Sequence, residues 1–498
     1  MITLDNIYED LERTIDSLYH DKSALEKSRA IVDRVLDDGN SYYGINTGFG
    51  FLANKKIDAE QLEKLQHNLL LSHAVGLGDS IPKNITKLML QLKIVALSLG
   101  YSGVSVEVVE RLMLFLKNDW IPVVPSKGSL GASGDLAPLA HLALPLLGKG
   151  YFWSTKDNEQ LRAKTVLKNA NLEPINLKAK DGLALINGTQ MMTAYGAHIL
   201  ERANSLLKNA DILAAISLEA LMGSARPFDE RIQAIRPHPG QKAVASNMRL
   251  LLTDSAILES HKNCDKVQDP YSLRCIPQVH GATRDLLEYA SGVIERELNS
   301  VTDNPLVFSD GDIISGGNFH GQPLALAMDS AAIAIAEIAS IAERRIYLLL
   351  RGLDGLPTVL VNDSGINSGF MIPQYTAASL VSHNKVLCHP ASVDSIPSCL
   401  GQEDHVSMGS ISAIKLLEVL NNVEQVLAIE AFTAAQALDF RKPLKAGRGV
   451  EVAHQEIRKR VSHKDADEFF GDDIDACIDM LRGNHILKEV EKQIGKLQ

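Results

Sequence analysis

The segment Gly128-Ser-Leu-Gly-Ala-Ser-Gly-Asp135 combines residue types that permit unusual backbone chemistry. Ala132, Ser133 and Gly134 carry close to the smallest set of side chains through which a main chain can fold back on itself. The Gly134 amide can attack the Ala132 carbonyl only where bulk is low and the backbone angles are unusual. Loss of water then leaves Ser133 as a dehydroalanine-like methylene, an electrophile that no ordinary side chain provides.

Three other interpretations of this segment compete with cyclisation. A phosphate-binding loop requires G-x-x-x-x-G-K-[ST], and here Asp135 stands in the lysine position, where its charge would repel phosphate. A nucleophile elbow requires G-x-S-x-G, and the stretch from Gly131 ends in Asp135 in place of the last glycine. An ordinary turn is the default for an isolated Gly/Ser loop. Although Ala-Ser-Gly triplets are common, the longer string that continues to His141 is a specific signal.

Other polar, glycine-rich segments interrupt a mostly apolar, helical pattern. Chemistry tends to be located in such loops because a rigid scaffold positions them. We therefore expect the functional residues in six segments, namely 42–50, 126–135, 187–189, 268–274, 315–322 and 402–405.

Four long runs of apolar residues at helical spacing must position these loops. They cover residues 190–222, 277–301, 322–350 and 407–440 and contain almost no proline. Each is far longer than the mean helix of roughly 11–12 residues, and such runs indicate a coiled coil, a membrane span or an extended bundle. Strict heptads are absent and alanine is frequent, so we predict a large helical bundle that other subunits complete.

The N-terminal part predicts shorter elements. Helices are expected over 58–73 and 82–99, and a loop over 126–136. Ser23 and Glu26 form a capping-box pattern for a further helix, which Gly39 is expected to end.

Composition indicates which binding partners and which cellular compartment are expected. The 498 residues carry a formal net charge of −11, which argues against nucleic acid because phosphate binding needs a basic surface. The apolar stretch 324–342 contains Asp329 and Glu337, so we interpret it as a buried helix and predict no membrane partner. The first ten residues lack a signal-peptide core, and the five cysteines form no C-x-x-C pair. Reduced thiols in a cytoplasmic protein are expected.

The chain resembles the aromatic amino acid ammonia-lyases over nearly its whole length, through six separated motifs in the family's order. The resemblance implies that Ala132-Ser133-Gly134 cyclises autocatalytically to 4-methylidene-imidazol-5-one (MIO), with no soluble cofactor. It also implies a homotetramer whose active sites each draw on three subunits. The predicted fold is therefore mainly α, a long-helix bundle of the aromatic amino acid lyase type. We predict a single lyase unit over 1–498, with a loop-rich portion at 1–190 carrying the electrophile and a bundle with C-terminal helices over 191–498.

The resemblance assigns a role to further residues. Tyr43 becomes the base that removes a proton from the β-carbon of the substrate, although a phenol titrates near ~10 and would need a lowered pKa. Arg274 becomes the ligand of the substrate carboxylate, which a guanidinium fork can bind through two parallel hydrogen bonds. Packed aromatics and a surface ion pair are the ordinary structural alternatives. The other substrate-binding residues that the resemblance implies are Asn187, Gln268, Tyr271 and Phe319.

Two positions favour the histidine branch of this family. Ser72-His73 and Glu403 match that branch, whereas phenylalanine and tyrosine lyases differ at both places. A carboxylate and an imidazole can hydrogen-bond both ring nitrogens of an imidazole substrate, and against a phenyl ring each would be left unpaired at roughly 1–3 kcal/mol. We therefore expect elimination of ammonia from L-histidine to give trans-urocanate, with a tyrosine or phenylalanine lyase or an aminomutase as the alternative.

Three other functions have weaker support in the sequence: a dinucleotide site, a non-catalytic assembly role and a metal site. Gly48 to Ala53 match a G-x-G-x-x-A dinucleotide pattern, but no β-α-β context surrounds them. A non-catalytic helical assembly protein could keep the Gly/Ser loop only as a turn. No metal is predicted, because the candidate ligands lack the spacing of a zinc site. Those candidates are His383, Cys388, His389, Cys399 and His405.

Overall fold

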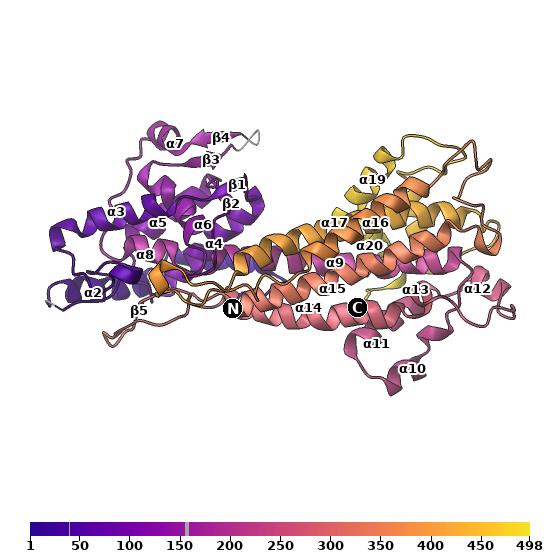
Figure 1. The fold of residues 1–498 in the computed structure, drawn as a ribbon, viewed down its shortest axis with the longest axis horizontal. Coiled ribbons are helices and arrows are strands. Elements are labelled where there is room, and N and C mark those ends of the chain that lie inside the picture. The colour runs from indigo at the N-terminus through magenta and orange to yellow at the C-terminus, as the bar shows by residue number, and fades with distance from the viewer. Residues whose placement is uncertain (39, 155–158) are drawn as a thin grey trace. The chain divides into compact units, whose positions relative to one another are not determined.

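The computed structural model describes residues 1–38, 40–154 and 159–498, and helices dominate it (Figure 1). The chain divides into two compact units. The first comprises Met1–His198, Ser291–Asp329 and Pro390–Ile414, and the second Ile199–Ala290, Ser330–His389 and Lys415–Gln498. Each unit therefore combines segments that are far apart in sequence. The predicted division at residue 190 follows chain order and stays a prediction.

Among its described residues, the first unit consists mostly of short helices and three small two-stranded sheets. All three sheets are antiparallel and pair β1 (Leu77–Ser80) with β2 (Pro125–Lys127), β3 (Tyr151–Trp153) with β4 (Gln160–Arg162), and β5 (Leu306–Val307) with β6 (Ile313–Ile314). The α-helices are α1 (Ile7–Leu18), α2 (Ser23–Leu36), α3 (Leu62–His73), α4 (Lys83–Ser98), α5 (Val106–Lys117), α6 (Leu136–Ala143), α7 (Ala163–Asn169) and α8 (Asp181–Ile186). Short 3-10 turns lie at η1 (Gly50–Leu52), η2 (Ala59–Gln61), η3 (Leu144–Leu147) and η6 (Cys399–Gly401).

The helices predicted over 58–73 and 82–99 are confirmed as η2 with α3 and as α4. The predicted capping box is wrong, because Ser23 is the first helical residue of α2 and Lys22 occupies the cap position. The carboxylate of Asp21 accepts a hydrogen bond from the Ser23 N–H at 2.9 Å and satisfies it instead. The predicted end at Gly39 lies outside the described residues.

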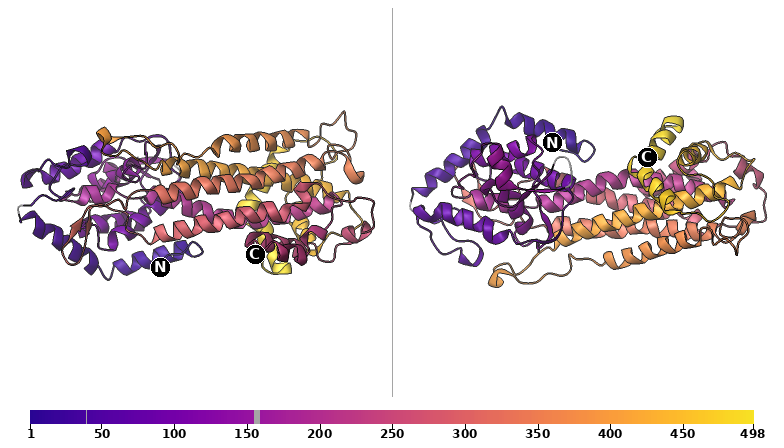
Figure 2. Two further views of the ribbon diagram at one scale, coloured as in Figure 1. Left: turned by 60° about the horizontal axis from the view of Figure 1, so that its bottom comes forward. Right: turned by 90° about the horizontal axis from the view of Figure 1, so that it is seen from above.

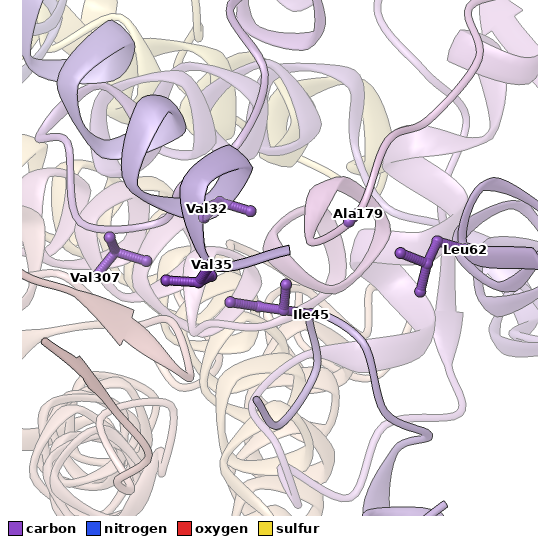
Figure 3. Close-up of a cluster of buried hydrophobic side chains, with 6 residues drawn as sticks. All are labelled: Val32, Val35, Ile45, Leu62, Ala179 and Val307. Carbon is purple, nitrogen blue, oxygen red and sulfur yellow. The ribbon is translucent and has the colours of Figure 1, made fainter. Parts of the chain in front are cut away.

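A buried apolar cluster holds the segment that leads into the functional loops (Figure 3). Val32 and Val35 lie one turn apart on α2 and pack with side chains from four other segments. Burying each such side chain stabilises the fold by about 1.5–3 kcal/mol. Tyr42 packs against the same cluster, so the cluster positions the start of segment 42–50. Its other buried members are Ile45, Leu62, Ala179 and Val307.

Long helices form the second unit and continue into the first. The four predicted long runs are confirmed as α9 (Gln190–Ala220), α14 (Ile276–Leu298), α15 (Gln322–Leu349) and α17 (Gly409–Asp439), which lie side by side in Figures 1 and 2. The remaining helices are α10 (Glu230–Ile235), α11 (Pro239–Leu251), α12 (Ala256–Ser260), α13 (Tyr271–Arg274), α16 (Met371–Leu387), α18 (Arg448–Arg458), α19 (Gly471–Arg482) and α20 (His485–Ile494), with 3-10 turns η4 (Arg226–Phe228) and η5 (Leu353–Gly355).

Ion pairs join the long helices inside the second unit. The Arg345 guanidinium of α15 donates to both carboxylate oxygens of Glu430 on α17, at 2.5 and 2.9 Å. His280 of α14 donates through Nδ1 to Asp211 of α9 at 2.7 Å. All four side chains are fully buried. Each long helix therefore contributes at least one charged or ionisable group to the interior.

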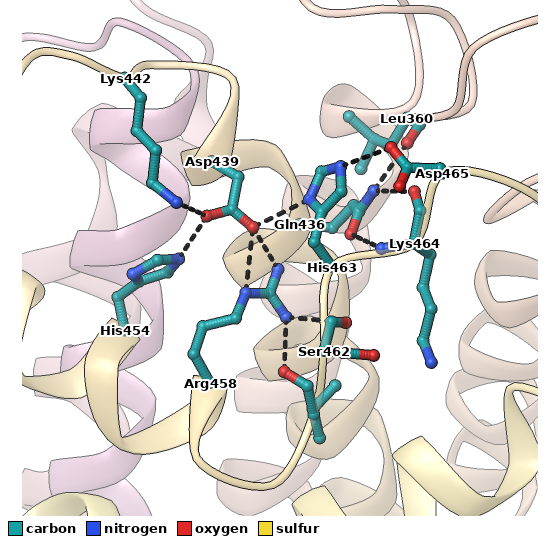
Figure 4. Close-up of polar contacts among 11 residues, drawn as sticks. Leu360, Gln436, Asp439, Lys442, His454, Arg458, Ser462, His463, Lys464 and Asp465 are labelled. Atoms are coloured by element: carbon teal, nitrogen blue, oxygen red, sulfur yellow. Dashed lines mark hydrogen bonds and ion pairs between the residues drawn. The ribbon is translucent and has the colours of Figure 1, made fainter.

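A carboxylate fastens the end of α17 to the segments that follow (Figure 4). Asp439 accepts from Lys442 at 2.8 Å, from Arg458 at 2.8 Å and from His463 at 2.9 Å, and it pairs with His454 at 3.2 Å. Despite partial burial, these donors hold the pKa of Asp439 well below its usual range. The cluster ties α18 and the following loop to the bundle.

Helix α15 is long and apolar enough to cross a membrane by length and composition alone. However, 67% of its most apolar 18-residue window is buried within the protein. A core helix of a bundle has the same property because apolar neighbours surround it.

Candidate active site

The loop between β2 and α6 has the backbone geometry that only glycine permits. Gly131 and Gly134 have φ angles of +67° and +77°. Gly134 forms a parallel bridge with Gly188, and a Cβ at Gly134 would overlap the Gly188 carbonyl. A side chain is therefore excluded on both conformational and steric grounds. Low bulk and unusual backbone angles are the two conditions for the cyclisation predicted at Ala132-Ser133-Gly134.

Two neighbouring segments hold this loop in place. The Met408 N–H donates to the Leu130 carbonyl at 2.9 Å, and the Ser410 hydroxyl donates to the Ser129 carbonyl at 2.8 Å. On the other side, the Asp135 N–H donates to the Gly188 carbonyl at 2.8 Å. The loop is consequently anchored at both ends, which is how a strained backbone persists.

Two buried ionisable groups lie behind the loop. The Asp135 carboxylate accepts from the N–H groups of Met191 and Met192 at 2.9 and 3.1 Å, at the start of α9, and burial raises its pKa to about 7. Its other oxygen has no hydrogen-bond partner among the described residues. Lys93 of α4 donates to the Asn187 carbonyl at 2.6 Å, and burial lowers its pKa to about 7. Such perturbed groups are typical of functional sites.

A cavity of about 960 Å³ in the first unit brings together most of the predicted site residues. Its walls come from segment 43–57, α3, the loop before α6, α8, segment 304–319 and segment 399–403. A cavity of this size holds a small-molecule substrate. The predicted residues that line it are Tyr43, His73, Ser133, Asn187, Phe319 and Glu403.

Glu403 faces the residue that is predicted to become the electrophile. The Ser133 hydroxyl donates to one carboxylate oxygen of Glu403 at 3.1 Å, and the Ser398 hydroxyl donates to the other at 2.9 Å. The Ser398 N–H also donates to the Glu403 carbonyl at 2.7 Å. Both backbone and side chain therefore fix the direction of this carboxylate.

His73 presents a hydrogen-bond acceptor. Its Nδ1 lies 2.8 Å from the Leu69 carbonyl oxygen, which can only accept, so Nδ1 carries the proton in the neutral ring. Burial lowers the pKa of His73 below the usual value for histidine, which favours that neutral form. Nε2 is then left with a lone pair that can accept from a substrate N–H.

Tyr43 has a higher pKa than a base at neutral pH requires. Burial raises its pKa, and the charges of Glu403 and Cys399 raise it further. The Gly50 N–H donates to the Tyr43 oxygen at 3.3 Å and acts in the opposite direction. The groups of this unit alone therefore do not prepare the phenol to take a proton, and a nearby cation is needed.

Gln268, Tyr271 and Arg274 belong to the second unit and are not among the described residues that line the cavity. The Arg274 guanidinium lies 4.5 Å from the centre of the Tyr271 ring, and its Nε donates to the Asp269 carbonyl at 3.1 Å. Tyr271 is 70% exposed. The structure thus gathers six predicted side chains at the cavity of the first unit, and these three belong to the second unit.

Sequence reasoning missed Lys93, Lys55 and Ser398. A lysine inside the apolar run Leu92-Lys93-Ile94 was a usable signal, because buried lysines are rare. The other two carry no distinguishing pattern. Among residues 1–38, 40–154 and 159–498, no group of three or more His, Cys, Asp or Glu side chains could hold a metal ion.

The comparison with known proteins agrees with this geometry. The aromatic amino acid lyase family model matches residues 6–459. Histidine ammonia-lyase from Myxococcus xanthus is 49% identical over 481 residues, covering 96% of this chain and 94% of the relative. The enzyme of the same name from Sorangium cellulosum is 52% identical, with 94% and 93% covered.

Solved structures show the same fold. Histidine ammonia-lyase from Trypanosoma cruzi is 41% identical with a TM-score of 0.87, covering 95% of this chain and 89% of that one. Tyrosine aminomutase from Streptomyces globisporus is 35% identical with a TM-score of 0.90, covering 100% and 98%. The predicted mainly α, long-helix fold is confirmed.

Proposed function

This chain belongs to the aromatic amino acid lyase family, and we propose that it is a histidine ammonia-lyase that converts L-histidine to trans-urocanate and ammonia. The observation that carries the proposal is the meeting of His73, Ser133 and Glu403 at one cavity. Curated histidine ammonia-lyases at about 50% identity over nearly the whole chain support it.

The loop 131–134 fits an autocatalytic MIO group. Gly134 has a positive φ and no room for a side chain, and Ser133 lines the cavity. The group would be built from Ala132, Ser133 and Gly134 and would need no soluble cofactor. When formed, it supplies an electrophile that turns a poor amine leaving group into a good one.

Glu403 and His73 would select the imidazole ring. The Nε2 of His73 accepts from one ring N–H, and the Glu403 carboxylate engages the other nitrogen in its protonated state. A phenyl ring offers neither contact and would leave both protein groups unpaired in the cavity. This pair therefore favours histidine over phenylalanine or tyrosine.

Tyr43 is proposed to take the β-proton, with Asn187 and Phe319 lining the site around it. The β C–H and α C–N bonds break, a C=C bond forms between the two carbons, and nitrogen leaves as ammonia. Because burial and Glu403 raise the pKa of Tyr43, the phenol needs a cation beside it when substrate is bound. Arg274 is the proposed source and also the ligand of the substrate carboxylate.

A homotetramer with shared active sites would bring that arginine into place. Arg274 pairs with no acidic side chain among the described residues, so its guanidinium is available to a carboxylate. Gln268 and Tyr271 would arrive on the same segment. Exposed apolar side chains on α15 also indicate a surface that another subunit covers. Those side chains are Leu326, Ile333 and Tyr347.

We also propose that the protein is located in the cytoplasm. The five cysteines are thiols, as expected in a reducing compartment.

An activity assay of the purified protein without added cofactor tests the proposed function. We expect urocanate absorbance to appear with L-histidine, and little or no cinnamate with phenylalanine or coumarate with tyrosine. β-Amino acid analysis of the same reactions detects an aminomutase. Turnover of tyrosine or phenylalanine in preference to histidine would show that the cavity has been assigned to the wrong substrate.

A further inference from the structure

The cavity contains one side chain with a fixed positive charge. Among the described residues that line it, Lys55 is the only lysine or arginine and Glu403 the only acid. All other polar lining groups are amides, hydroxyls, a thiol, an imidazole and a phenol. The electrostatic character of the cavity therefore depends on these two residues.

The local fold fixes the position of Lys55. The Gly48 N–H donates to the Lys55 carbonyl at 2.9 Å, and the Lys55 N–H donates to the Leu52 carbonyl at 3.0 Å. Thr47 and Lys56 form an antiparallel bridge beside it. The segment that carries Tyr43 thus turns back and brings Lys55 to the same cavity.

The ammonium group of Lys55 is available for a ligand. No acidic side chain among the described residues lies within ion-pair distance of it, whereas Lys83 and Lys87 both pair with Asp119. Lys55 is exposed at the cavity, so the charge keeps its hydration without a ligand. An unpaired, hydrated cation at a cavity attracts an anionic group from solution.

The proposed substrate and product need such a cation. Histidine enters as a zwitterion whose carboxylate the charge of Glu403 repels, and urocanate leaves as an anion. Glu403 is held by Ser398 and directed at Ser133, so its negative charge stays at the cavity. The positive charge of Lys55, in the same unit, offsets the repulsion between Glu403 and the substrate carboxylate.

We propose that Lys55 is a second carboxylate-binding residue, which captures the substrate carboxylate at the cavity before the final bound position is reached. The inference rests on the proposed function and extends it. Because the ammonium continues to attract the carboxylate equally in the enzyme–substrate complex and in the transition state, it contributes uniform binding, which changes KM more than kcat. Lys55 is therefore a substrate-binding residue.

The test compares Lys55→Gln with two matched variants. Lys64→Gln removes an exposed lysine of α3 that does not line the cavity, and Lys55→Arg keeps the charge. An ion pair at an exposed site is worth up to about fivefold in affinity. We expect Lys55→Gln to raise KM for histidine about three- to fivefold with kcat within about twofold, and the other two variants to resemble wild type.

Two inhibitors, one with a carboxylate and one without, measure the contribution of the carboxylate to binding. Urocanate carries it and histamine lacks it, so Lys55→Gln should weaken inhibition by urocanate about three- to fivefold and leave histamine unchanged. The difference between the variants should shrink at about 1 M salt, where charges are screened within about 3 Å. Equal weakening of both inhibitors, or an unchanged KM, would overturn the role of Lys55. Absence of histidine turnover in wild type would instead reject the proposed function.

Discussion

Both units contain buried ion pairs, such as Lys180 with Asp303 at 2.7 Å in the first unit, but the two buried groups behind the loop 131–134 are held in a different way. In the second unit, Arg345 and Glu430 form a two-point ion pair, and His280 pairs with Asp211. In the first unit, Lys93 donates to a backbone carbonyl and Asp135 accepts from two backbone amides. Within the described part of the chain neither of the latter two forms a salt bridge, and burial moves the pKa of each to about 7.

A buried ion pair and a buried group without an opposite charge have different roles. A buried pair of opposite charges fixes how helices meet, and its loss leaves an uncompensated charge. Buried groups that are held by main-chain dipoles and amides, without an opposite charge, stay close to titration at neutral pH, which is costly for the fold and common at active sites. Replacements at the loop 131–134 should therefore affect activity most, and replacement of the Arg345–Glu430 pair should affect stability most.

Replacing Ser133 with alanine should give the largest effect on the first unit. Without the serine hydroxyl no water can leave to form the methylidene, so histidine turnover should fall roughly a thousandfold or more. Urocanate formation measures this loss. Intact-mass measurement of the wild type should show a deficit of two waters relative to the open chain.

The same variant should fold normally, because Ser133 lines a cavity and fills no core position. Its circular dichroism and melting temperature should match those of wild type. An open, unmodified chain in fully active wild-type protein would refute the electrophile.

Replacing Arg345 with methionine should give the largest effect on the second unit. The change leaves Glu430 as a buried carboxylate without its cation, which costs about 3–5 kcal/mol. The free energy of unfolding in urea should fall by that amount, whereas turnover per folded molecule should stay near the wild-type value.

The double replacement of Arg345 with Met and Glu430 with Leu serves as the control. Because it removes both charges, it should recover most of the lost stability. If Arg345→Met lowers kcat and leaves the unfolding free energy intact, the contrast between the units does not hold.

The stability of the first unit should depend on pH through Lys93. Burial lowers its pKa from a usual value of 10.5 to about 7, so between these values the unfolded chain holds a proton that the folded protein has lost. The unfolding free energy must then rise with pH across this window, while below pH 7 the penalty is fully present. Replacing Lys93 with methionine removes the rise.

Urea unfolding at pH 7 and pH 9 measures this effect. The wild type should gain about 2 kcal/mol more than Lys93→Met between the two conditions. Loss of the hydrogen bond to Asn187 lowers the stability of the variant equally at both values, so it cancels in the comparison. Parallel pH profiles would show that Lys93 keeps an ordinary pKa.

Much of the fold could be predicted from sequence because helical periodicity is local. The four long runs and the helices α3 and α4 were found within a few residues of their bounds. The cap of α2 was not, since the carboxylates of Asp21 and Glu26 can both accept from the Ser23 amide and sequence does not rank them. The pairing of Arg345 with Glu430, 85 positions apart, depends on helix packing that periodicity does not encode.

The site was less predictable from residue patterns alone. Ser133 and Glu403 are 270 positions apart, and only the resemblance to a family linked them before the structure placed them 3.1 Å apart. The small residues at 131–134 did indicate their own chemistry, because positive φ angles need glycine. The raised pKa of Tyr43 could not be foreseen, since burial and the charges of distant segments cause it.

Glu403→Gln in the first unit tests substrate selection at the cavity. The amide keeps the shape of the side chain and can still hydrogen-bond, but it cannot engage a protonated ring nitrogen with a full charge. Losing a charge-assisted contact of this kind costs about 1–3 kcal/mol, so kcat/KM for histidine should fall roughly 10- to 100-fold. For phenylalanine or tyrosine, which make no such contact, kcat/KM should stay level or rise, because a charge beside the apolar ring is removed. Competition between histidine and tyrosine in a single reaction measures the ratio directly. A variant that loses both activities in equal proportion would place Glu403 in the shared chemistry at Ser133 and not in recognition of the imidazole.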